Sequence, residues 1–303
     1  MKKIMACAMI LTLSLSLMAC GGNGDNSSQA NSSKQENSSK QEESSQETSG
    51  QETSSTTAKI TGTATGSGST SVEPIIQQLK DEFEAKNPGT TIEYEGNSSG
   101  SGITAANENV SMFGCASREL KEEEKAFGMT VETFAYDGIA AIVHPDNTVS
   151  DISMEDLKKI YTGEVTNWKE LGGNDAPIVV VSRENGSGTK SAFEELVGFE
   201  DALVSDATIA EGNGNVQSTV ASNPNAIGYV SFTYIDETVK ALTVEGVEAT
   251  DANVKNSTYK ISRPFLIFWH EENMNEVAKA FVEFMMSAEG QAIVAEKAIP
   301  VTD

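Results

Sequence analysis

The sequence predicts an α/β fold, and three observations lead to this prediction. Residues 59–303 contain short apolar runs typical of strands, and several of these runs are followed by turns rich in glycine, serine and threonine. Beyond such a turn, apolar residues recur at helical spacing, as at Ile76, Leu79 and Phe83. The segment is also long enough to form two lobes or one large domain.

The first residues indicate the cellular compartment. Lys2 and Lys3 precede a mostly apolar run that is too short to span a membrane as a helix but suits a signal peptide. The run ends in Leu-Met-Ala-Cys-Gly around Cys20, which resembles a bacterial lipobox, whereas the alternative is a plain signal peptide with an incidental cysteine. We expect residues 1–20 to be a lipoprotein signal peptide. Lipidation of Cys20, for example with palmitate, would then anchor an extracytoplasmic protein to the outer face of the cell membrane.

Residues 21–58 are expected to be a disordered tether. They consist almost entirely of Ser, Gln, Glu, Asn, Thr, Gly and Lys, and a chain without aromatic or branched aliphatic residues cannot bury enough surface to fold. Loss of the signal peptide leaves Cys115 as the one cysteine of the folded part, so no internal disulfide forms there. We expect Cys115 to be a small core residue.

The net charge limits the possible ligands. A formal charge of −24 makes nucleic acid an unlikely partner, because the protein would repel its phosphates. A small anion would be repelled as well, so its capture must depend on short-range dipoles and on one or two guanidinium groups. The three cysteines and two histidines are too scattered for a metal site. We therefore expect neither a metal nor a cofactor.

The strongest candidate site is a turn that follows the apolar run 178–181 and precedes a helix-like segment. Its residues are Ser182, Arg183, Glu184, Asn185, Gly186, Ser187, Gly188 and Thr189. The glycines allow left-handed or nest geometry, and the free N–H groups of a helix start carry positive partial charge. Arg183 adds a planar fork that suits phosphate or sulfate oxygens. This turn is therefore expected to hold an oxyanion.

Three further strand-to-helix turns use similar residues. They are 66–71 after the strand-like run 60–64, 96–102 after the run 91–95, and 117–118 after the run 112–116. We expect Thr70 or Ser71 to cap the first helix, Ile103 to begin the second, and Ser117 to begin a charged helix through Lys125. Any one turn can be a helix cap without a ligand, but ligands of α/β sheets bind where such turns converge.

Two enzyme motifs compete with this interpretation. Residues 96–100 match G-x-S-x-G with Ser98 as the nucleophile, and His270 lies downstream, as a secreted serine hydrolase would require. The surroundings of His270, however, are more typical of a partly buried ring at a strand end. Residues 100–105 match a dinucleotide fingerprint, which is out of place in a protein tethered outside the cell. A structural or adhesive surface protein is a third alternative.

Seven stretches of the chain form a recognisable pattern, at 68–72, 116–120, 135–140, 160–168, 182–189, 226–230 and 262–265. Through these stretches, and across nearly all of residues 59–303, the chain resembles the phosphate-binding lipoproteins of bacterial ABC-type phosphate importers. The resemblance implies a bilobed type II periplasmic-binding-protein fold, in which two α/β lobes are joined by a two-crossing hinge and phosphate lies in the cleft between them. On this basis lobe 1 comprises residues 59–138 and 240–303, and lobe 2 comprises residues 139–239.

The resemblance also implies which residues bind phosphate. The positions carried over are Ser69, Thr70, Ser71, Ser99, Ser117, Arg183, Asn185, Ser187, Gly188 and Thr189. Two of them depart from the best-known pattern, because Ser117 and Asn185 stand where that pattern has aspartates. Hydrogenphosphate brings a proton that needs an acceptor and sulfate brings none, so a serine predicts phosphate binding with weaker exclusion of sulfate. Sulfate and molybdate are alternative ligands.

The implied function is the capture of inorganic phosphate and its delivery to the membrane permease of an ABC importer. Closure of the cleft around phosphate would create the surface that the permease recognises. No bond is made or broken, so the protein is not expected to be an enzyme. The expected partners are phosphate, the permease and, through the lipid anchor alone, the membrane. The protein itself is expected to be a monomer.

Overall fold

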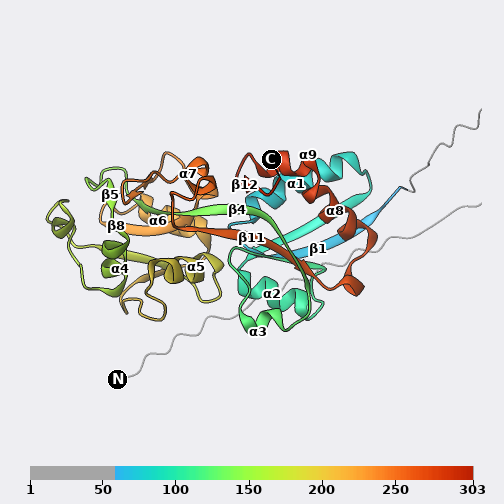
Figure 1. Ribbon diagram of the computed structural model, residues 1–303, viewed down its shortest axis with the longest axis horizontal. Coiled ribbons are helices and arrows are strands. Elements are labelled where there is room, and N and C mark those ends of the chain that lie inside the picture. The colour runs from blue at the N-terminus through green and yellow to red at the C-terminus, as the bar shows by residue number, and fades with distance from the viewer. Residues whose placement is uncertain (1–58, 303) are drawn as a thin grey trace, which may run out of the picture. The chain divides into compact units, whose positions relative to one another are not determined.

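The computed structural model describes residues 59–302, and Figure 1 shows their arrangement. The expected signal peptide with Cys20 and the expected tether at 21–58 lie outside these residues. The strands are β1 (Gly62–Ser69), β2 (Thr90–Asn97), β3 (Phe113–Ala116), β4 (Thr130–Val143), β5 (Asp151–Ile152), β6 (Val179–Arg183), β7 (Thr208–Ala210), β8 (Ala226–Ser231), β9 (Lys240–Ala241), β10 (Thr243–Val244), β11 (Ser262–Trp269) and β12 (Ile299–Pro300). The α-helices are α1 (Glu73–Lys86), α2 (Ser99–Asn107), α3 (Glu122–Lys125), α4 (Met154–Thr162), α5 (Gly188–Val197), α6 (Gly212–Ala221), α7 (Asp251–Lys255), α8 (Glu276–Met286) and α9 (Ala288–Val294). Short 3-10 helices are η1 (Trp168–Leu171), η2 (Phe232–Tyr234) and η3 (Glu271–Asn273).

The long strand β4 belongs to both lobes. Hydrogen-bonded strands follow the order β2-β1-β3-β11-β4-β8-β6-β7. β4 pairs antiparallel with β11 up to Gly138, and from Ile139 onward it pairs antiparallel with β8. Figure 1 shows β4 and β11 side by side between the two groups of helices. This is the bilobed α/β fold that the sequence predicted, with β4 as the first crossing.

The first lobe has helices on both faces of its sheet. β1 pairs parallel with β2 and β3, as expected of strands joined through helices. On one face α1, α8 and α9 pack over a hydrophobic core. In this core the rings of Phe83 and Phe281 pack edge to face, with their centroids 5.4 Å apart. On the other face α2 packs through Ile103 and Ala106 against Phe268 of β11. Cys115 is buried in the first of these cores, as predicted.

The second lobe repeats this arrangement. β6 pairs parallel with β8 and β7, and β8 is antiparallel to β4. On one face α4 and α5 form an aromatic core, where the rings of Phe193 and Tyr229 stack with centroids 4.1 Å apart. On the other face α6 packs through Val216 and Val220. Each lobe therefore has its own hydrophobic core, and the strand ends between the lobes are free to form a site.

The second crossing differs from its predicted place after residue 239. β9 pairs with the end of β4, and Leu242, Tyr259 and Ile261 are buried in the aromatic core of the second lobe. The chain returns to the first lobe where Ile261 is followed by β11, with Ile139 N donating to Ile261 O at 2.8 Å. The packing therefore assigns residues 240–261 to the second lobe, because their apolar side chains are buried there.

Three helix starts also differ from the predictions. The N-cap of α1 is Val72, which has no side-chain capping bond, so neither Thr70 nor Ser71 caps that helix. α2 begins at Ser99 rather than at Ile103, with the Ser98 hydroxyl accepting from Ser101 N. α3 begins at Glu122, and Ser117 precedes it in irregular chain. Glycine and serine fit both turns and first helical turns, which explains these shifts.

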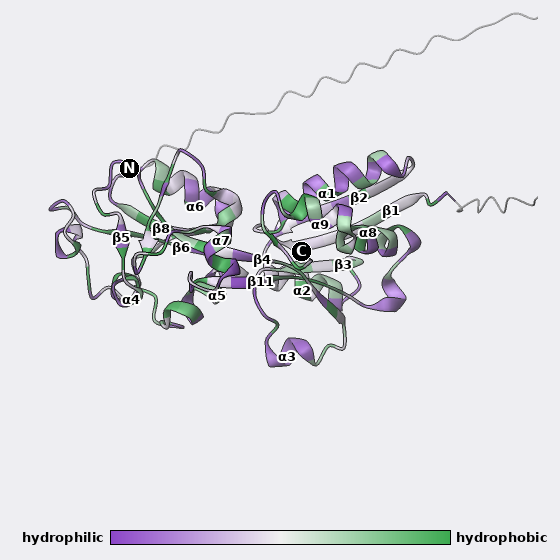
Figure 2. Cartoon of the chain, turned by 45° about the horizontal axis from the view of Figure 1, so that its top comes forward, coloured by the Kyte–Doolittle hydropathy of each residue, from purple (hydrophilic) through white to green (hydrophobic). Residues whose placement is uncertain are grey.

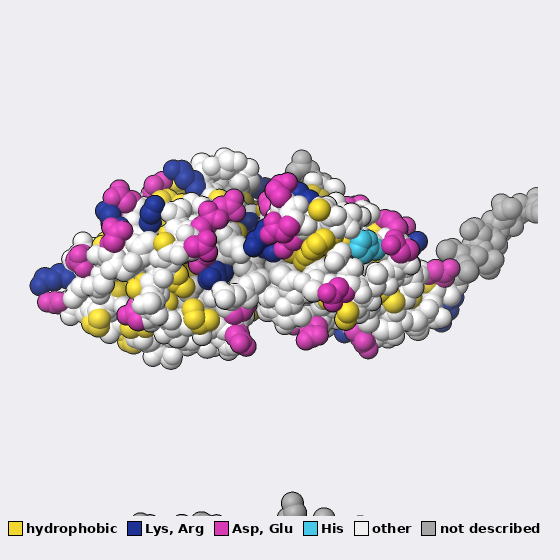
Figure 3. All heavy atoms as spheres, turned by 90° about the horizontal axis from the view of Figure 1, so that it is seen from below, with side chains coloured by type: hydrophobic (Ala, Val, Ile, Leu, Met, Phe, Trp, Pro, Cys, Tyr) yellow, Lys and Arg dark blue, Asp and Glu magenta, His cyan; other side chains and the backbone are white. Residues whose placement is uncertain are grey.

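The surface of the described residues is polar and rich in acidic side chains. The glutamate-rich α3 appears purple, hence hydrophilic, in Figure 2. Figure 3 shows acidic side chains spread over both lobes on the face in view. Among residues 59–302, no helix has the length and apolarity needed to cross a membrane. Within the same range, no group of three or more His, Cys, Asp or Glu side chains could hold a metal ion.

Candidate functional site

The N-termini of α2 and α5 face each other across the boundary between the lobes. The N–H of Gly100 in α2 donates to the carbonyl of Gly186, in the turn before α5, at 3.0 Å. A Cβ on Gly188 would overlap the Ser99 hydroxyl oxygen and would lie 2.8 Å from that of Ser117. Glycine at position 188 therefore permits this close approach. Both helix starts direct N–H groups with positive partial charge toward the same space.

The first lobe contributes a buried chain of hydroxyl groups. Ser71 N donates to Ser69 Oγ at 3.1 Å, and Ser69 Oγ donates to Ser117 Oγ at 2.8 Å. Ser117 N donates in turn to Ser99 Oγ at 3.1 Å. Ser69 has thus committed its one hydroxyl hydrogen to Ser117. Its role in this arrangement is to orient Ser71 and Ser117.

The second lobe contributes a buried guanidinium. Arg183, at the end of β6, is 2% exposed, and its Nε and Nη2 each donate to Glu184 at 2.8 Å. Its Nη1 is buried and has no hydrogen-bond partner among the described residues. Buried charged donors are rarely left unpaired, so Nη1 indicates a place for an acceptor from outside the protein.

The start of α5 completes this side of the site. Ser187 is its N-cap, and the Ser187 hydroxyl accepts from Lys190 N at 3.2 Å. Thr189, in the first turn, is buried. Asn185 is exposed instead, and its side-chain oxygen accepts from Lys190 Nζ at 3.4 Å. The predicted residue Asn185 therefore lies outside the buried cluster.

Two hydrogen bonds between predicted residues join the lobes at this point. The hydroxyls of Ser71 and Thr189 are 2.9 Å apart, and Arg183 Nη2 donates to Thr70 Oγ1 at 3.4 Å. The structure therefore brings nine of the ten predicted positions to one interlobe site, with Asn185 at its edge. These nine are Ser69, Thr70, Ser71, Ser99, Ser117, Arg183, Ser187, Gly188 and Thr189.

Sequence reasoning missed Asn213, which lies in the first turn of α6 and is fully buried. Its Nδ2 donates to Thr70 Oγ1 and to Ser71 Oγ, at 3.0 Å each. Its Oδ1 accepts from Ser231 N at 3.1 Å. The signal was a fifth glycine-rich turn after a strand, in which Gly212 and Gly214 flank Asn213.

A second buried arginine was also missed as a site residue. Arg263 on β11 is 4% exposed and pairs with Asp137, its directly opposite partner on β4, through Nη2 at 2.7 Å. The same Nη2 donates to Ser71 Oγ at 3.2 Å, and Nη1 donates to Ser117 O at 3.1 Å. Both residues lie in the stretches 135–140 and 262–265 that carried the family resemblance, although no role was assigned to them.

Burial and neighbouring charges shift the pKa values of the ionisable groups in the site. Burial raises the pKa of Glu184, but hydrogen bonds and charge from Arg183 outweigh burial, so its pKa lies below the ordinary value. Burial raises the pKa of Asp137, and the charge of Arg263 opposes that rise. Burial lowers the pKa of Arg263, and the nearby positive charge of Arg183 contributes to this lowering. The two guanidinium groups therefore lie close enough to repel each other.

The geometry does not support Ser98 as a nucleophile. Its hydroxyl caps α2, accepting from Ser101 N at 3.1 Å and lying 2.8 Å from Ser101 Oγ. Neither His144 nor His270 makes a hydrogen bond to it in the described part of the chain. Nδ1 of His144 accepts from Asp146 N, and His270 is the N-cap of η3. A serine hydrolase requires a base in contact with its nucleophile.

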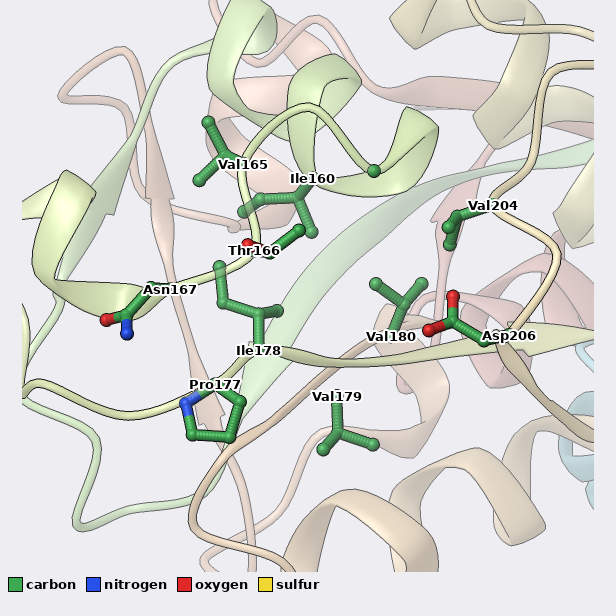
Figure 4. A pocket seen from close by; sticks show the side chains of 11 residues that line it. Ile160, Val165, Thr166, Asn167, Pro177, Ile178, Val179, Val180, Val204 and Asp206 are labelled. Atoms are coloured by element: carbon green, nitrogen blue, oxygen red, sulfur yellow. The ribbon is translucent and has the colours of Figure 1, made fainter.

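The structure has one pocket beside this interlobe site and another pocket away from it. One, of about 510 Å³, is open at the cleft mouth and includes Thr70 and Ser98 from one lobe and Glu184 and Asn185 from the other. The other, of about 450 Å³, lies in the second lobe and is shown in Figure 4. Its wall is mainly apolar, with Asn167 and Asp206 at opposite ends of the view, and it contains none of the predicted site residues.

Two α/β lobes with a buried polar site between them define a solute-binding protein of the periplasmic-binding type. In agreement, residues 53–289 match the family model of the PBP superfamily domain. The phosphate-binding protein PstS of Bacillus subtilis is 34% identical over 253 residues, which cover 81% of this chain and 83% of that protein. The PstS of Borreliella burgdorferi is 30% identical over 241 residues, covering 76% of this chain and 86% of the relative.

Solved structures of phosphate-binding proteins also resemble this chain. A putative phosphate ABC transporter substrate-binding protein from Clostridium perfringens, with bound phosphate, is 51% identical with a TM-score of 0.79, covering 80% of this chain and all of that one. An ABC-type phosphate transport receptor from Vibrio cholerae is 34% identical with a TM-score of 0.67, covering 79% of this chain and all of that one. The chain therefore belongs to the PstS family of phosphate-binding proteins.

Proposed function

We propose that this protein captures inorganic phosphate in its interlobe cleft, outside the cytoplasm, and delivers it to the permease of an ABC importer. The observation that carries this proposal is the buried, unpartnered Nη1 of Arg183, a residue whose Nη2 reaches Thr70 of the other lobe. A tetrahedral oxyanion supplies the acceptors that this arrangement of donors requires. Membership of the PstS family and a phosphate-bound relative support phosphate as that anion.

The residues divide into four roles. Arg183 and the helix-start groups of Ser99, Gly188 and Thr189 would contact phosphate oxygens directly, as would the hydroxyls of Thr70 and Ser71. Ser117 would receive the proton of hydrogenphosphate, because a hydroxyl can accept as well as donate. Ser69 and Ser187 would hold these groups in place through the bonds described above. Asn185 would line the mouth through which the anion enters.

Binding would be coupled to closure of the lobes. The first-lobe hydroxyls and the second-lobe arginine meet only when the N-termini of α2 and α5 approach, so a bound anion favours the closed arrangement. The movement would be absorbed where β4 and the chain before β11 cross between the lobes. No catalytic step is assigned, because binding, closure and release complete this function.

Ser117 sets the expected selectivity. A carboxylate at this position would reject sulfate by leaving lone pairs facing each other, whereas a hydroxyl can turn and donate. The site should therefore prefer phosphate but exclude sulfate less strictly than a site with an aspartate.

Attachment to the membrane is proposed through lipidation of Cys20, with the protein acting as a monomer. The lipid attached to Cys20 would hold the protein at the membrane surface. Metabolic labelling with a clickable palmitate tests this proposal. Label in the full chain that is lost in Cys20→Ala supports the anchor, and equal label in both argues against it.

Thermal denaturation with added anions tests the central proposal. Phosphate should raise the melting temperature in a concentration-dependent way, since a ligand that binds the folded state stabilises it. Arsenate should act similarly, and sulfate and molybdate less. Arg183→Met should abolish the phosphate effect, whereas Arg118→Met, whose arginine pairs with Glu124 on α3, should keep it. No shift with any of the four anions would favour a structural or adhesive role instead.

A further inference from the structure

The turn that leads from β1 into α1 has two backbone carbonyl groups that the turn itself does not use. Val72 N donates to Ser69 O at 3.2 Å, and this bond closes the turn. The hydrogen bonds of the helix begin with Val72 O, which accepts from Ile76 N at 3.1 Å. The carbonyl oxygens of Thr70 and Ser71 lie between these two acceptors. They therefore need donors from elsewhere in the protein.

The second lobe supplies a donor for each of these carbonyls from the short helix η2. The Tyr234 hydroxyl donates to Thr70 O at 3.0 Å, and Thr233 Oγ1 donates to Ser71 O at 3.4 Å. Burial raises the pKa of Tyr234 to about 12, with a smaller contribution from the charge of Glu73, so the hydroxyl keeps its hydrogen at neutral pH. Both bonds cross from one lobe to the other.

The helix η2 is fixed to the second lobe. The side chains of Phe232 and Tyr234 pack against the hydrophobic core on the α6 face of that lobe. The ring of Phe232 also packs against the ring of Tyr259, with their centroids 5.4 Å apart. A Cβ on Gly138, where the pairing of β4 with β11 ends, would overlap the Phe232 ring. A rotation of the second lobe about this crossing therefore carries η2 with it.

The first lobe holds the same turn from its own side. Tyr94 on β2 donates through its hydroxyl to Ser69 O at 3.2 Å. That bond lies within one lobe, so it does not depend on the angle between the lobes. The bond from Tyr234 to Thr70 does depend on this angle. At 3.0 Å it is lost when the two oxygens move apart by about 0.6 Å, so a small opening of the cleft breaks it.

From this arrangement we propose that Tyr234 and Thr233 are positioning residues that stabilise the closed lobes and so lengthen the residence time of bound phosphate. The inference rests on the proposed function. Thr70 lines the pocket at the cleft mouth and Tyr234 does not, so Tyr234 acts through the backbone of the turn rather than on the ion. Its bond forms only after the lobes approach. It should therefore slow release of the ion without changing its capture.

The release of radiolabelled phosphate into an excess of unlabelled phosphate measures the dissociation rate, and calorimetric titration measures the affinity. Tyr234→Phe keeps the ring and removes the donor. Its dissociation rate should rise about fivefold and its affinity should fall by the same factor, as expected for the loss of one hydrogen bond. The association rate should stay the same. Tyr136→Phe is a matched control, because this tyrosine on β4 is 46% exposed, and it should change neither rate.

Unfolding in urea without phosphate separates this role from a purely structural one. If the bond forms only in the closed arrangement, Tyr234→Phe should unfold at the same urea concentration as the unmodified protein. An unchanged dissociation rate would overturn the inference, whether the affinity stays the same or falls through slower association. A lower urea midpoint with unchanged affinity would also overturn it, because the bond would then stabilise the fold in both arrangements.

Thr233 provides a second and independent comparison. Thr233→Val removes the hydroxyl with little change of shape, whereas Thr233→Ser retains it. In the Tyr234→Phe background, Thr233→Val should raise the dissociation rate by about a further twofold, because the bond that it removes is the longer one, and Thr233→Ser should not raise it. Equal rates in these two double variants would contradict the role of Thr233.

These outcomes are distinguishable from failure of the proposed function. Absence of phosphate binding in the unmodified protein would contradict phosphate capture itself. Phosphate binding with equal dissociation rates in the unmodified protein and in Tyr234→Phe would contradict only the role of Tyr234. If Tyr234→Phe does not fold, Thr233→Val and Thr233→Ser in the otherwise unmodified protein give the same test of bonds from η2.

Discussion

Replacing Gly188 by alanine is expected to keep the two lobes apart. The added Cβ would overlap Ser99 Oγ and lie 2.8 Å from Ser117 Oγ, so α5 could not approach α2 as closely as it does. Separation would break three cross-lobe bonds, from Gly100 N to Gly186 O, between Ser71 and Thr189, and from Arg183 to Thr70. At about 1 kcal/mol for each hydrogen bond, phosphate binding should weaken by about 3 kcal/mol, or roughly 150-fold.

Calorimetric titration with phosphate measures this loss, and unfolding in urea without phosphate provides the second readout. The clash lies between the lobes, so the ligand-free protein should keep its stability while losing affinity. Gly214→Ala in α6 is a matched control, because its Cβ would meet nothing nearer than the Tyr234 ring at 3.9 Å. Unchanged affinity in Gly188→Ala would refute the conclusion that binding requires this close approach.

Three further changes test separate parts of the structure. Ser117→Asp supplies an obligate acceptor, so competition calorimetry should show sulfate affinity falling at least about tenfold relative to phosphate, and an equal loss for both anions would contradict the role of Ser117. Glu184 has a lowered pKa in the folded protein, so its stabilising effect is present above its unfolded pKa and is lost as pH falls through the folded pKa. Glu184→Gln should therefore reduce the fall of melting temperature with decreasing pH on the acid side. An unchanged fall would mean that other carboxyl groups cause it. Phe281→Ala removes a buried ring packed on Phe83, and should lower the free energy of unfolding in urea by about 3–5 kcal/mol. A loss below about 1 kcal/mol would mean that neighbouring side chains move into the cavity left by the ring.

Local patterns in the sequence predicted the elements with strong periodicity. The spacing of Ile76, Leu79 and Phe83 identified α1, and the short apolar run before Ser117 identified β3. The extent of α3 was wrong because its charged residues have no apolar stripe that would mark a buried face. The second crossing was misplaced because β9 and β10 are two residues long each, and their assignment depends on packing rather than on pattern.

The predicted site positions that the structure brings together lie mostly in contiguous turns. Arg183 and Gly188 stand in one motif, so their proximity was evident before the fold was known. Asn213 was not recognised, because its amide becomes important only when α6 brings it to Thr70. Arg263 was missed as a site residue for a related reason. Its pairing with Asp137 depends on the register of two strands distant in sequence, which no local pattern encodes.

The pairing of each buried arginine with a carboxylate has a consequence for the rate of capture. Arg183 is matched by Glu184 and Arg263 by Asp137, so little positive potential extends into solvent to attract an anion toward a chain of formal charge −24. Dissolved salt screens that long-range repulsion and leaves the buried contacts almost untouched. Association with phosphate should therefore accelerate as ionic strength rises, while the residence time of the bound ion stays nearly constant. Such behaviour is the reverse of electrostatically steered binding, and it would suit uptake from saline surroundings.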